Sequence, residues 1–342
     1  MRAVVIREHG GPEVLLFEDR PIPEPGPREV RVRVRAVGLN HLDLWVRDGV
    51  EGHAFPLPIV PGCDVAGVVD ALGPGARGVA VGDEVVVAPG VSCGRCGACR
   101  AGNDALCPEY GILGESMDGG CQDALIVPDV NVFSKPPGLA WEEAAAVPLT
   151  FLTAWHMLHG RARVEPGERV LVHAAGSGVS AAAIQIATLL GAHVMTTAGT
   201  DEKCARGLAL GAEEAVNYRS LDFAKEARRF SGGRGVDVVV DHVGTDTFQK
   251  SLRCLAKGGR YVTCGATSGF ELKTDFRLVF FKSLSILGST MGGSHELATV
   301  LALVGSGRLR PIVDRVYPFS RIAEAHARLA AREAFGKIVL AF

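Results

Sequence analysis

The stretch Arg169-Val-Leu-Val-His-Ala-Ala-Gly-Ser-Gly178-Val-Ser-Ala-Ala182 decides the fold of this chain. Its first residues are apolar and β-branched, as in a buried strand, and its last are small residues that favour a helix. The glycines between them allow a tight turn, in which N–H groups at a helix N-terminus can approach a pyrophosphate. The pattern predicts a dinucleotide site at Gly176, Ser177, Gly178 and Val179. Ala181 stands where a third glycine is usual, so an ordinary glycine turn is the alternative.

Buried strands and helices alternate on the C-terminal side of this turn. Helices are expected at 181–190 and 201–210, and strands at 192–197, 236–241, 259–264 and 284–288. Strands that alternate with helices pair in parallel and have helices on both faces. The sequence therefore predicts an α/β fold class with a doubly wound parallel sheet.

The first part of the chain has the pattern of short strands, without the helices that alternate with strands further along. Residues 30–37 alternate apolar and polar side chains with period two, which is the pattern of a strand with one wet face. Further short strands are expected at 65–69 and 84–88, between turns rich in glycine and proline. We expect a β-rich domain at 1–141, a cofactor-binding domain at 142–290, and a return of 291–342 to the first domain, ending in a strand at 336–342.

Composition excludes several classes of protein. The chain has 342 residues and a formal net charge of -2, so no bulk attraction to nucleic acid or to an anionic membrane is expected. No apolar run approaches the roughly 18 residues that span a bilayer. Charges within Met1–Arg7 argue against a secretory signal. We expect a cytoplasmic protein that acts on a small-molecule substrate and binds neither nucleic acid nor membrane.

Four of the nine cysteines crowd together, which favours a metal over disulfides in a chain without a secretory signal. Cys93, Cys96, Cys99 and Cys107 follow the pattern C-x2-C-x2-C-x7-C, with glycines between them. Four thiolates would close a tetrahedral site, so we expect one structural zinc per chain in a lobe at 92–108. Clustered thiols without metal are one alternative. A zinc ribbon that binds nucleic acid is another, disfavoured because the lobe has only two arginines, Arg95 and Arg100.

The choice between NAD and NADP depends on the end of the second strand of the cofactor domain. An acid there would bind the ribose 2′-hydroxyl of NAD, but no acid stands at the end of the strand expected at 192–197, where the chain reads Thr196-Thr-Ala198-Gly-Thr200. Asp201 and Glu202 come later, where they can cap the next helix. Lys203 and Tyr218 could face a 2′-phosphate. We therefore expect NADPH, with NADH as the alternative.

Taken together, these features resemble the medium-chain dehydrogenase/reductase superfamily over the whole chain. Matching segments include Gly62-Cys-Asp-Val-Ala-Gly-Val-Val69, Gly82-Asp-Glu-Val85 and Gly119-Gly120. The segments 148–150, 173–175 and 197–203 look most like the quinone oxidoreductase branch. The resemblance implies a GroES-like domain followed by a Rossmann domain. It also implies a homodimer or homotetramer, formed through the sheet edge near 284–288.

The same resemblance implies further cofactor-binding residues. In the quinone oxidoreductase branch, the counterparts of Gly199, Lys203 and Tyr218 surround the 2′-phosphate of NADPH. The neighbouring Thr200 is assigned to the same site, as are Asp241 and Gly265, which lie at the ends of two later strands.

The positions of the family's catalytic zinc ligands carry different residues in this chain. The resemblance places the first cysteine ligand at Asn40, the histidine at Cys63, before Asp64, and the second cysteine near Leu149. Asn and Leu are poor zinc ligands, so we expect the catalytic zinc to be lost.

Hydrogen bonds would then have to polarise the reacting oxygen. We expect Asn40 to donate one, His41 or Asp43 to relay a proton, and Thr153 to lie beside the nicotinamide; Cys63 and Asp64 complete the candidate catalytic set. Each has an alternative: Asn40 and Asp43 as helix caps, His41 as a partly buried histidine with its bonds satisfied, and Cys63 as a core thiol.

The resulting hypothesis is an NAD(P)H-dependent oxidoreductase that transfers hydride to quinones, enones or carbonyls without catalytic zinc. The first alternative is a zinc-dependent alcohol dehydrogenase with unusual ligands, such as Cys63 with His41. The second, of another class, is a cofactor-binding protein without turnover.

Overall fold

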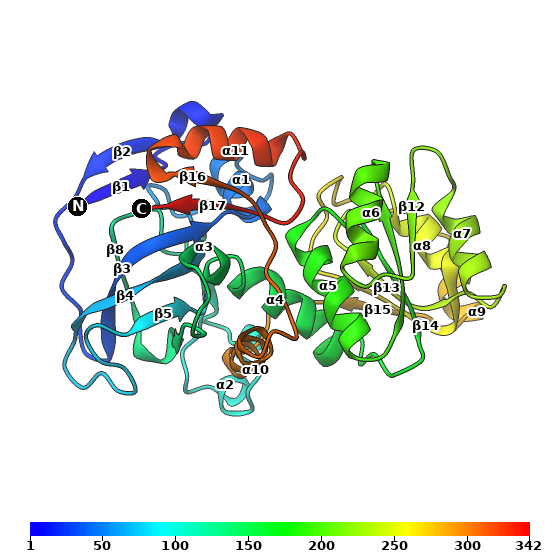
Figure 1. The fold of residues 1–342 in the computed structure, drawn as a ribbon, viewed down its shortest axis with the longest axis horizontal. Helices are drawn as coiled ribbons and strands as arrows, with labels where there is room; N and C mark the ends of the chain where they lie inside the picture. Colours follow the sequence, from blue (N-terminus) through cyan, green and yellow to red (C-terminus); the bar gives the residue numbers. More distant parts are fainter. The chain divides into compact units, whose positions relative to one another are not determined.

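The computed structural model describes residues 1–342 and contains two compact units. Unit 1 comprises Met1–Leu149, Gly293–Gly307 and Pro311–Phe342, and unit 2 comprises Thr150–Gly292 and Arg308–Arg310. In Figure 1 the blue and cyan segments and the red segments at the end of the chain lie in unit 1, and most of the green and yellow segments lie in unit 2. The first and last parts of the chain therefore fold together.

A seven-stranded sheet is the framework of unit 1. Its order is β16–β17–β3–β4–β5–β9, and β8 also pairs with β3. The expected return of the last strand is confirmed, because β17 lies antiparallel to β3 and parallel to β16. The bounds are β3 (Glu29–Gly38), β4 (Asp64–Leu72), β5 (Glu84–Val87), β8 (Ala124–Pro128), β9 (Val132–Ser134), β16 (Val313–Pro318) and β17 (Lys337–Ala341).

Smaller elements complete unit 1. The strands are β1 (Arg2–Val5), β2 (Leu16–Asp19), β6 (Gly90–Val91) and β7 (Gly111–Ile112), and the helices are α1 (His41–Asp48), α2 (Gly97–Arg100), α3 (Trp141–Ala144), α10 (Ser294–Gly305) and α11 (Ile322–Ala330). Short 3-10 turns lie at Pro12–Val14, Asp104–Leu106, Asp129–Asn131 and Phe319–Arg321.

The alternating pattern of β3 has the expected cause. Val30, Val32 and Val34 are buried in the core of unit 1, whereas the arginines between them are more exposed. Burying these β-branched side chains on one face stabilises the strand and fixes its register. The end of β3 leads directly into the residues before α1.

Unit 2 is a six-stranded, wholly parallel sheet in the order β12–β11–β10–β13–β14–β15. The strands are β10 (Arg169–Val172), β11 (His193–Ala198), β12 (Glu214–Asn217), β13 (Val236–Asp241), β14 (Leu255–Thr263) and β15 (Ser285–Gly288). The helices are α5 (Gly178–Leu189), α6 (Asp201–Ala209), α7 (Phe223–Phe230), α8 (Phe248–Cys254) and α9 (Phe276–Phe281). Helix α4 (Pro148–Trp155) continues into a π-helical turn at His156–Arg161. The expected doubly wound parallel sheet is confirmed.

Two details differ from the sequence-based expectation. Strand β12 was not expected, and α5 begins at Gly178 instead of Ala181. The glycine turn therefore feeds the helix directly. Residues 142–149, which we expected in the second domain, lie in unit 1, because α3 packs against β3 and β4.

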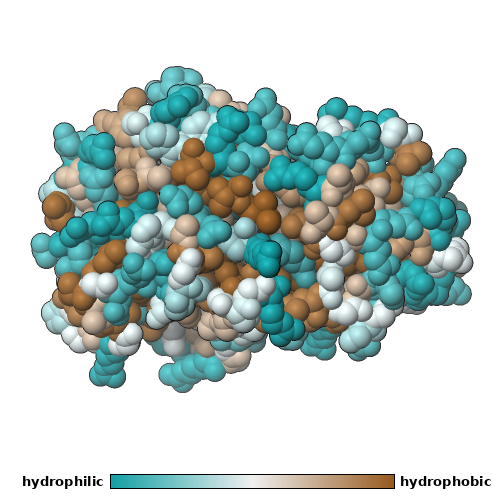
Figure 2. Space-filling view, in the orientation of Figure 1, coloured by the Kyte–Doolittle hydropathy of each residue, from teal (hydrophilic) through white to brown (hydrophobic).

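No helix is long and apolar enough to cross a membrane. On the face drawn in Figure 2, hydrophilic and hydrophobic residues are interspersed over the surface of each unit. A mixture of this kind is ordinary for surfaces that face water.

Candidate active site and metal centre

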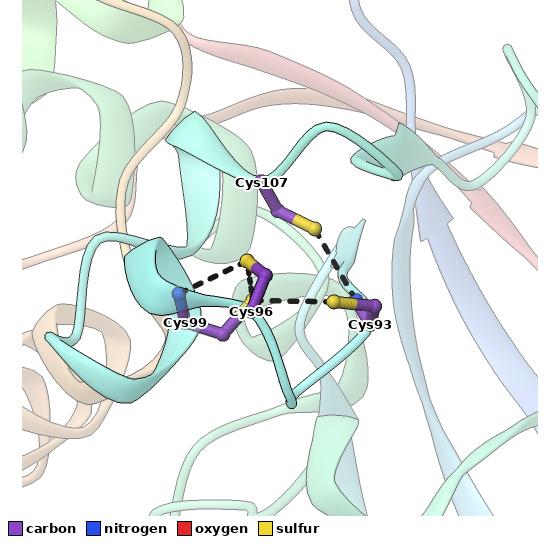
Figure 3. Close-up of side chains that lie close together, drawn as sticks. All are labelled: Cys93, Cys96, Cys99 and Cys107. Carbon is purple, nitrogen blue, oxygen red and sulfur yellow. Dashed lines mark hydrogen bonds between the residues drawn. The ribbon is translucent and has the colours of Figure 1, made fainter.

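The four cysteines of the lobe at 92–108 converge. Their sulfur atoms all lie within 4.8 Å of one another, and Figure 3 shows the side chains turned toward a common centre. The Sγ atoms of Cys96 and Cys99 are 3.5 Å apart, and those of Cys93 and Cys99 are 3.9 Å apart. Tetrahedral zinc with Zn–S bonds of about 2.3 Å requires sulfur separations of about 3.8 Å. The donor set and its spacing therefore fit zinc.

Backbone N–H groups also favour thiolates in this lobe. The Cys99 N–H donates to Cys96 Sγ at 3.5 Å, and the Glu109 N–H donates to Cys107 Sγ at 3.3 Å. Bonds from the N–H groups of Arg95 and Cys96 lower the pKa of the Cys93 thiol to about 7, whereas burial and the neighbouring thiols of Cys93 and Cys99 raise the pKa of Cys107 against its own N–H bonds. Since a coordinating thiol must lose its proton, these bonds prepare the cluster for a metal.

The second candidate site is a buried polar cluster in unit 1. It comprises Asn40, Asp43, Cys63, Asp64 and Lys337, each at most 7% exposed. The Lys337 ammonium donates to Asn40 Oδ1 and to Asp64 Oδ2, both at 2.7 Å. Asp64 Oδ1 accepts the Leu149 N–H at 2.6 Å. The three positions that the family resemblance assigned to catalytic zinc thus meet around an ion pair.

The side-chain amide of Asn40 is hydrogen-bonded within this cluster through both its nitrogen and its oxygen. Its Nδ2 lies 2.9 Å from Asp64 Oδ2, and 3.3 Å from both Gly38 O and Cys63 Sγ. Two N–H groups thus face three acceptors within the protein, and Oδ1 accepts from Lys337. This corrects our expectation that the Asn40 amide is available to a substrate oxygen. Asn40 is the N-cap residue of α1, and its backbone N–H is bonded to Asp43 on the first turn of that helix.

Asp43 holds the backbone around the cluster. Its carboxylate accepts the Asn40 N–H at 2.7 Å and the Gly62 N–H at 2.9 Å. The capping alternative is therefore confirmed for Asp43. Burial raises the pKa of Asp43 to about 6, against the lowering effect of the Asn40 N–H bond and of Lys337. Burial, with Asp64 and Asp43 nearby, raises the pKa of Cys63 well above its usual range, so the core-thiol alternative fits this residue.

Lys337 is the member of this cluster that sequence reasoning missed. It is a lone cation in the apolar run Lys337-Ile-Val-Leu-Ala341, and its strand pairs with β3, which leads to Asn40. A charge at the start of an otherwise buried strand was the available signal, because buried lysines are rare unless paired.

The dinucleotide turn lies at the carboxyl end of β10. Ala174 to Ser177 connect β10 to the twelve-residue helix α5, whose N-cap residue Ser177 makes no capping bond with its side chain. The first N–H groups of the helix are therefore not capped by that hydroxyl, as suits a turn that receives phosphate. Gly176 and Ser177 lie in this turn, and Gly178 and Val179 are the first two residues of α5.

The residues that we expected near a 2′-phosphate follow the carboxyl end of β11. Ala198 ends the strand, and the Thr200 hydroxyl caps α6 by accepting the Lys203 N–H at 3.2 Å. A Cβ built on Gly199 would lie 2.7 Å from the Tyr218 hydroxyl and 3.5 Å from Arg219 Nε. Gly199, Tyr218 and Arg219 therefore lie side by side, and Arg219 adds a cation that the sequence analysis overlooked.

The remaining candidate residues lie in separate places. Asp241 ends β13, where it accepts from the Thr247 hydroxyl and the Val243 N–H, both at 2.6 Å. Gly265 follows β14, and its carbonyl accepts from Thr263 Oγ1 at 2.9 Å. Thr153 is buried on α4 with its hydroxyl 3.8 Å from Met291 Sδ, and His41 is half-buried at the first position of α1.

A β-rich unit, a parallel sheet with a glycine turn after its β10 strand, and four converging cysteines are together typical of a nicotinamide-dependent oxidoreductase. Two family models match: the alcohol dehydrogenase GroES-like domain at residues 26–137, and the zinc-binding dehydrogenase at residues 210–340. The chain belongs to the medium-chain dehydrogenase/reductase superfamily.

Similar proteins include enzymes with different printed activities. Human quinone oxidoreductase is 32% identical, covering 99% of this chain and 97% of the relative. A 2-haloacrylate reductase from a Burkholderia species is 31% identical, covering 99% and 98%. A solved structure described as an NAD-dependent alcohol dehydrogenase is 54% identical with a TM-score of 0.97, covering 100% of both chains.

Proposed function

We propose that this protein is an NADPH-dependent reductase of quinones, enones or related carbonyls that works without catalytic zinc. The observation that carries the proposal is the buried ion pair of Lys337 with Asp64, which together bind the Asn40 amide. These groups already satisfy one another, and Asn and Leu supply no thiolate at two of the three positions that the family uses for zinc. The quinone oxidoreductase and 2-haloacrylate reductase relatives support the substrate class.

We propose different roles for the candidate catalytic residues of the two units. NADPH would supply a hydride to an electron-poor carbon of the substrate, and a proton would complete the reduction. Asn40 and Asp43 hold the backbone and the ion pair, so we assign them positioning roles. We propose His41, half-buried beside this cluster, as the proton source, and Thr153 as a contact of the nicotinamide.

The first experiment measures zinc per chain together with reduction of phenanthrenequinone by NADPH, on protein purified without added metal. We expect one zinc, held by the four cysteines, and turnover that survives exchange of this zinc for cadmium. Two zinc ions per chain, with alcohol oxidation that is lost on mild chelation, would instead support the zinc-dependent alternative. No turnover with any acceptor would support the non-catalytic one.

The NADPH preference rests on the end of β11. No carboxylate follows Ala198 directly, Asp201 is bonded to Asn217 Nδ2 at 2.8 Å, and Arg219 lies next to Gly199. A guanidinium suits a 2′-phosphate. We expect Arg219→Ala to lower the ratio of kcat/KM for NADPH to kcat/KM for NADH about tenfold, because the variant lacks one charge-assisted hydrogen bond to the 2′-phosphate. Arg277→Ala on α9 is the control, and an unchanged ratio in Arg219→Ala would contradict the assignment.

We further propose a homodimer or homotetramer that pairs through β15. This strand is the last of its sheet, Ile286 on it is 45% exposed, and α9 nearby exposes Phe276, Phe280 and Phe281. An open strand edge flanked by apolar side chains is suited to pairing with a second copy. Ile286→Lys should shift the mass in solution toward the monomer. Val316→Lys, on the edge strand of the other sheet, should leave it unchanged.

The thiol content favours the cytoplasm as the compartment. None of the nine cysteines forms a disulfide, and a zinc thiolate cluster is maintained best where thiols stay reduced. Fractionation of the source cells would test this, and recovery of the protein with the extracellular or membrane fraction would contradict it.

A further inference from the structure

A second buried network lies in unit 2, directly beneath the dinucleotide turn. His173 follows β10, is 1% exposed, and precedes Ala174, the first residue of the turn. Its Nδ1 lies 3.1 Å from the Thr197 hydroxyl on β11, and its Nε2 lies 2.9 Å from the Ser251 hydroxyl on α8. Burial lowers the pKa of His173, so the ring is neutral, with one donor and one acceptor nitrogen.

The direction of each bond follows from counting protons. Ser251 has a single hydroxyl proton, which it donates to Thr247 O at 2.9 Å. The Ser251 oxygen must therefore accept from His173 Nε2–H, which leaves Nδ1 as the acceptor. Thr197 then donates to His173 Nδ1, and its oxygen is free to accept the Ala174 N–H at 3.2 Å.

The residue that donates to the Thr197 hydroxyl, Ala174, has a strained backbone conformation. Ala174 has a φ of 56°, in the left-handed region that alanine rarely adopts. The Thr197 hydroxyl, fixed by His173, and the bond of Ala175 N–H to Thr197 O at 2.8 Å hold the chain in this conformation. The strain therefore persists only while the surroundings specify it.

The turn is held by two arms of hydrogen bonds: the first runs from His173 through Thr197 to Ala174, and the second runs through Ser180 to His242. Ser180 on α5 donates to His173 O, and its oxygen accepts from His242 Nε2 at 2.9 Å. His242 follows Asp241, whose carboxylate is bonded to Thr247 Oγ1. The two arms tie β10, β11, β13, α5 and α8 to the ends of one turn.

We propose that His173 is a positioning residue for the dinucleotide: through Thr197 it holds Ala174 in the conformation that aims the N–H groups of the turn and of α5 at the pyrophosphate. The proposal rests on the cofactor part of the proposed function. Under this proposal the two ring nitrogens have different roles. Nδ1 fixes the Thr197 hydroxyl that binds the turn, whereas Nε2 only binds the ring to Ser251 on α8.

Two substitutions separate these tasks. The side-chain oxygen of His173→Asn can take the place of Nδ1 and accept from Thr197, whereas the terminal amide of His173→Gln can take the place of Nε2 and donate to Ser251. Each variant loses one buried bond, so both should lose similar stability. We expect His173→Gln to weaken NADPH binding about tenfold, measured by nicotinamide fluorescence, and His173→Asn to weaken it less than threefold.

Amide hydrogen exchange without cofactor is the second readout. Exchange over residues 172–178 should accelerate in His173→Gln but not in His173→Asn. Equal effects of the two variants in both measurements would overturn the proposal and leave His173 a packing residue. Wild-type protein that binds no dinucleotide would refute the proposed function. The exchange result would then still decide whether His173 shapes the turn.

Discussion

Unit 1 contains two polar clusters, the cysteine lobe at 92–108 and the cluster around Asn40, and they differ in how the protein itself binds their side chains. In the lobe at 92–108, the sulfur atoms of three partly exposed cysteines and of the buried Cys107 all lie within 4.8 Å of one another. In the cluster around Asn40, the polar groups are buried and bonded to one another, with Lys337 as the cation among them. A metal needs donors that are left unsatisfied by the protein. The sulfur atoms of the lobe accept backbone N–H bonds but have no buried cation bonded to them, whereas in the buried cluster Lys337 already binds Asn40 Oδ1 and Asp64 Oδ2.

The largest effect should come from removing the cation of the buried cluster. Lys337→Met leaves Asp64, which is fully buried, without a counter-charge, and breaking a buried pair in this way costs about 3–5 kcal/mol. Urea denaturation at pH 7 measures the free energy of unfolding. The exposed pair of Lys250 with Asp222 is the control, since Lys250→Met should cost less than about 1 kcal/mol.

A rescue variant sharpens this test. Lys337→Met combined with Asp64→Asn carries no buried charge at these positions and should regain part of the lost stability. If Lys337→Met alone stays within 1 kcal/mol of the wild type, the ion pair does not organise the cluster as described.

The next effect concerns the lobe. Cys96→Ser should reduce the zinc content from one to none, because one of the four thiolates is missing. Where free zinc stands at about 100 times its Kd, loss of binding removes about 2.7 kcal/mol of stabilisation, and the lobe should become more susceptible to proteolysis. Cys204→Ser, in unit 2, should keep its zinc. An unchanged zinc content in Cys96→Ser would mean that the metal is bound elsewhere.

The smallest effect is a pH dependence. Burial raises the pKa of Asp43 to about 6, above its unfolded value of about 4. The stability it contributes is therefore complete below pH 4 and is lost as the pH rises through 6. Wild type should lose about 1 kcal/mol more than Asp43→Asn between pH 5 and pH 7, measured by denaturation at both values. Parallel curves for the two proteins would show that Asp43 does not titrate in this range.

The sequence predicted those features that depend on residues near one another in the chain. The cysteine lobe, the glycine turn and the alternation of strands and helices were all visible as spacing. Lys337 was not, because it reaches Asn40 across 297 positions and only the pairing of β17 with β3 brings them together. Arg219 was missed for a similar reason, since its proximity to Gly199 requires the short strand β12 to lie beside β11.

The distance along the chain between Asp64 and Lys337 also has a consequence in time. They are 273 positions apart. Because ribosomes add about 5–20 residues per second, Lys337 is synthesised roughly 14–55 s after Asp64. All of the strands of unit 2 emerge within that interval. A nascent chain therefore carries an unpaired acid in an incomplete sheet while the strands of unit 2 can already pair, and Asp64 gains its counter-charge only when β17 joins β3.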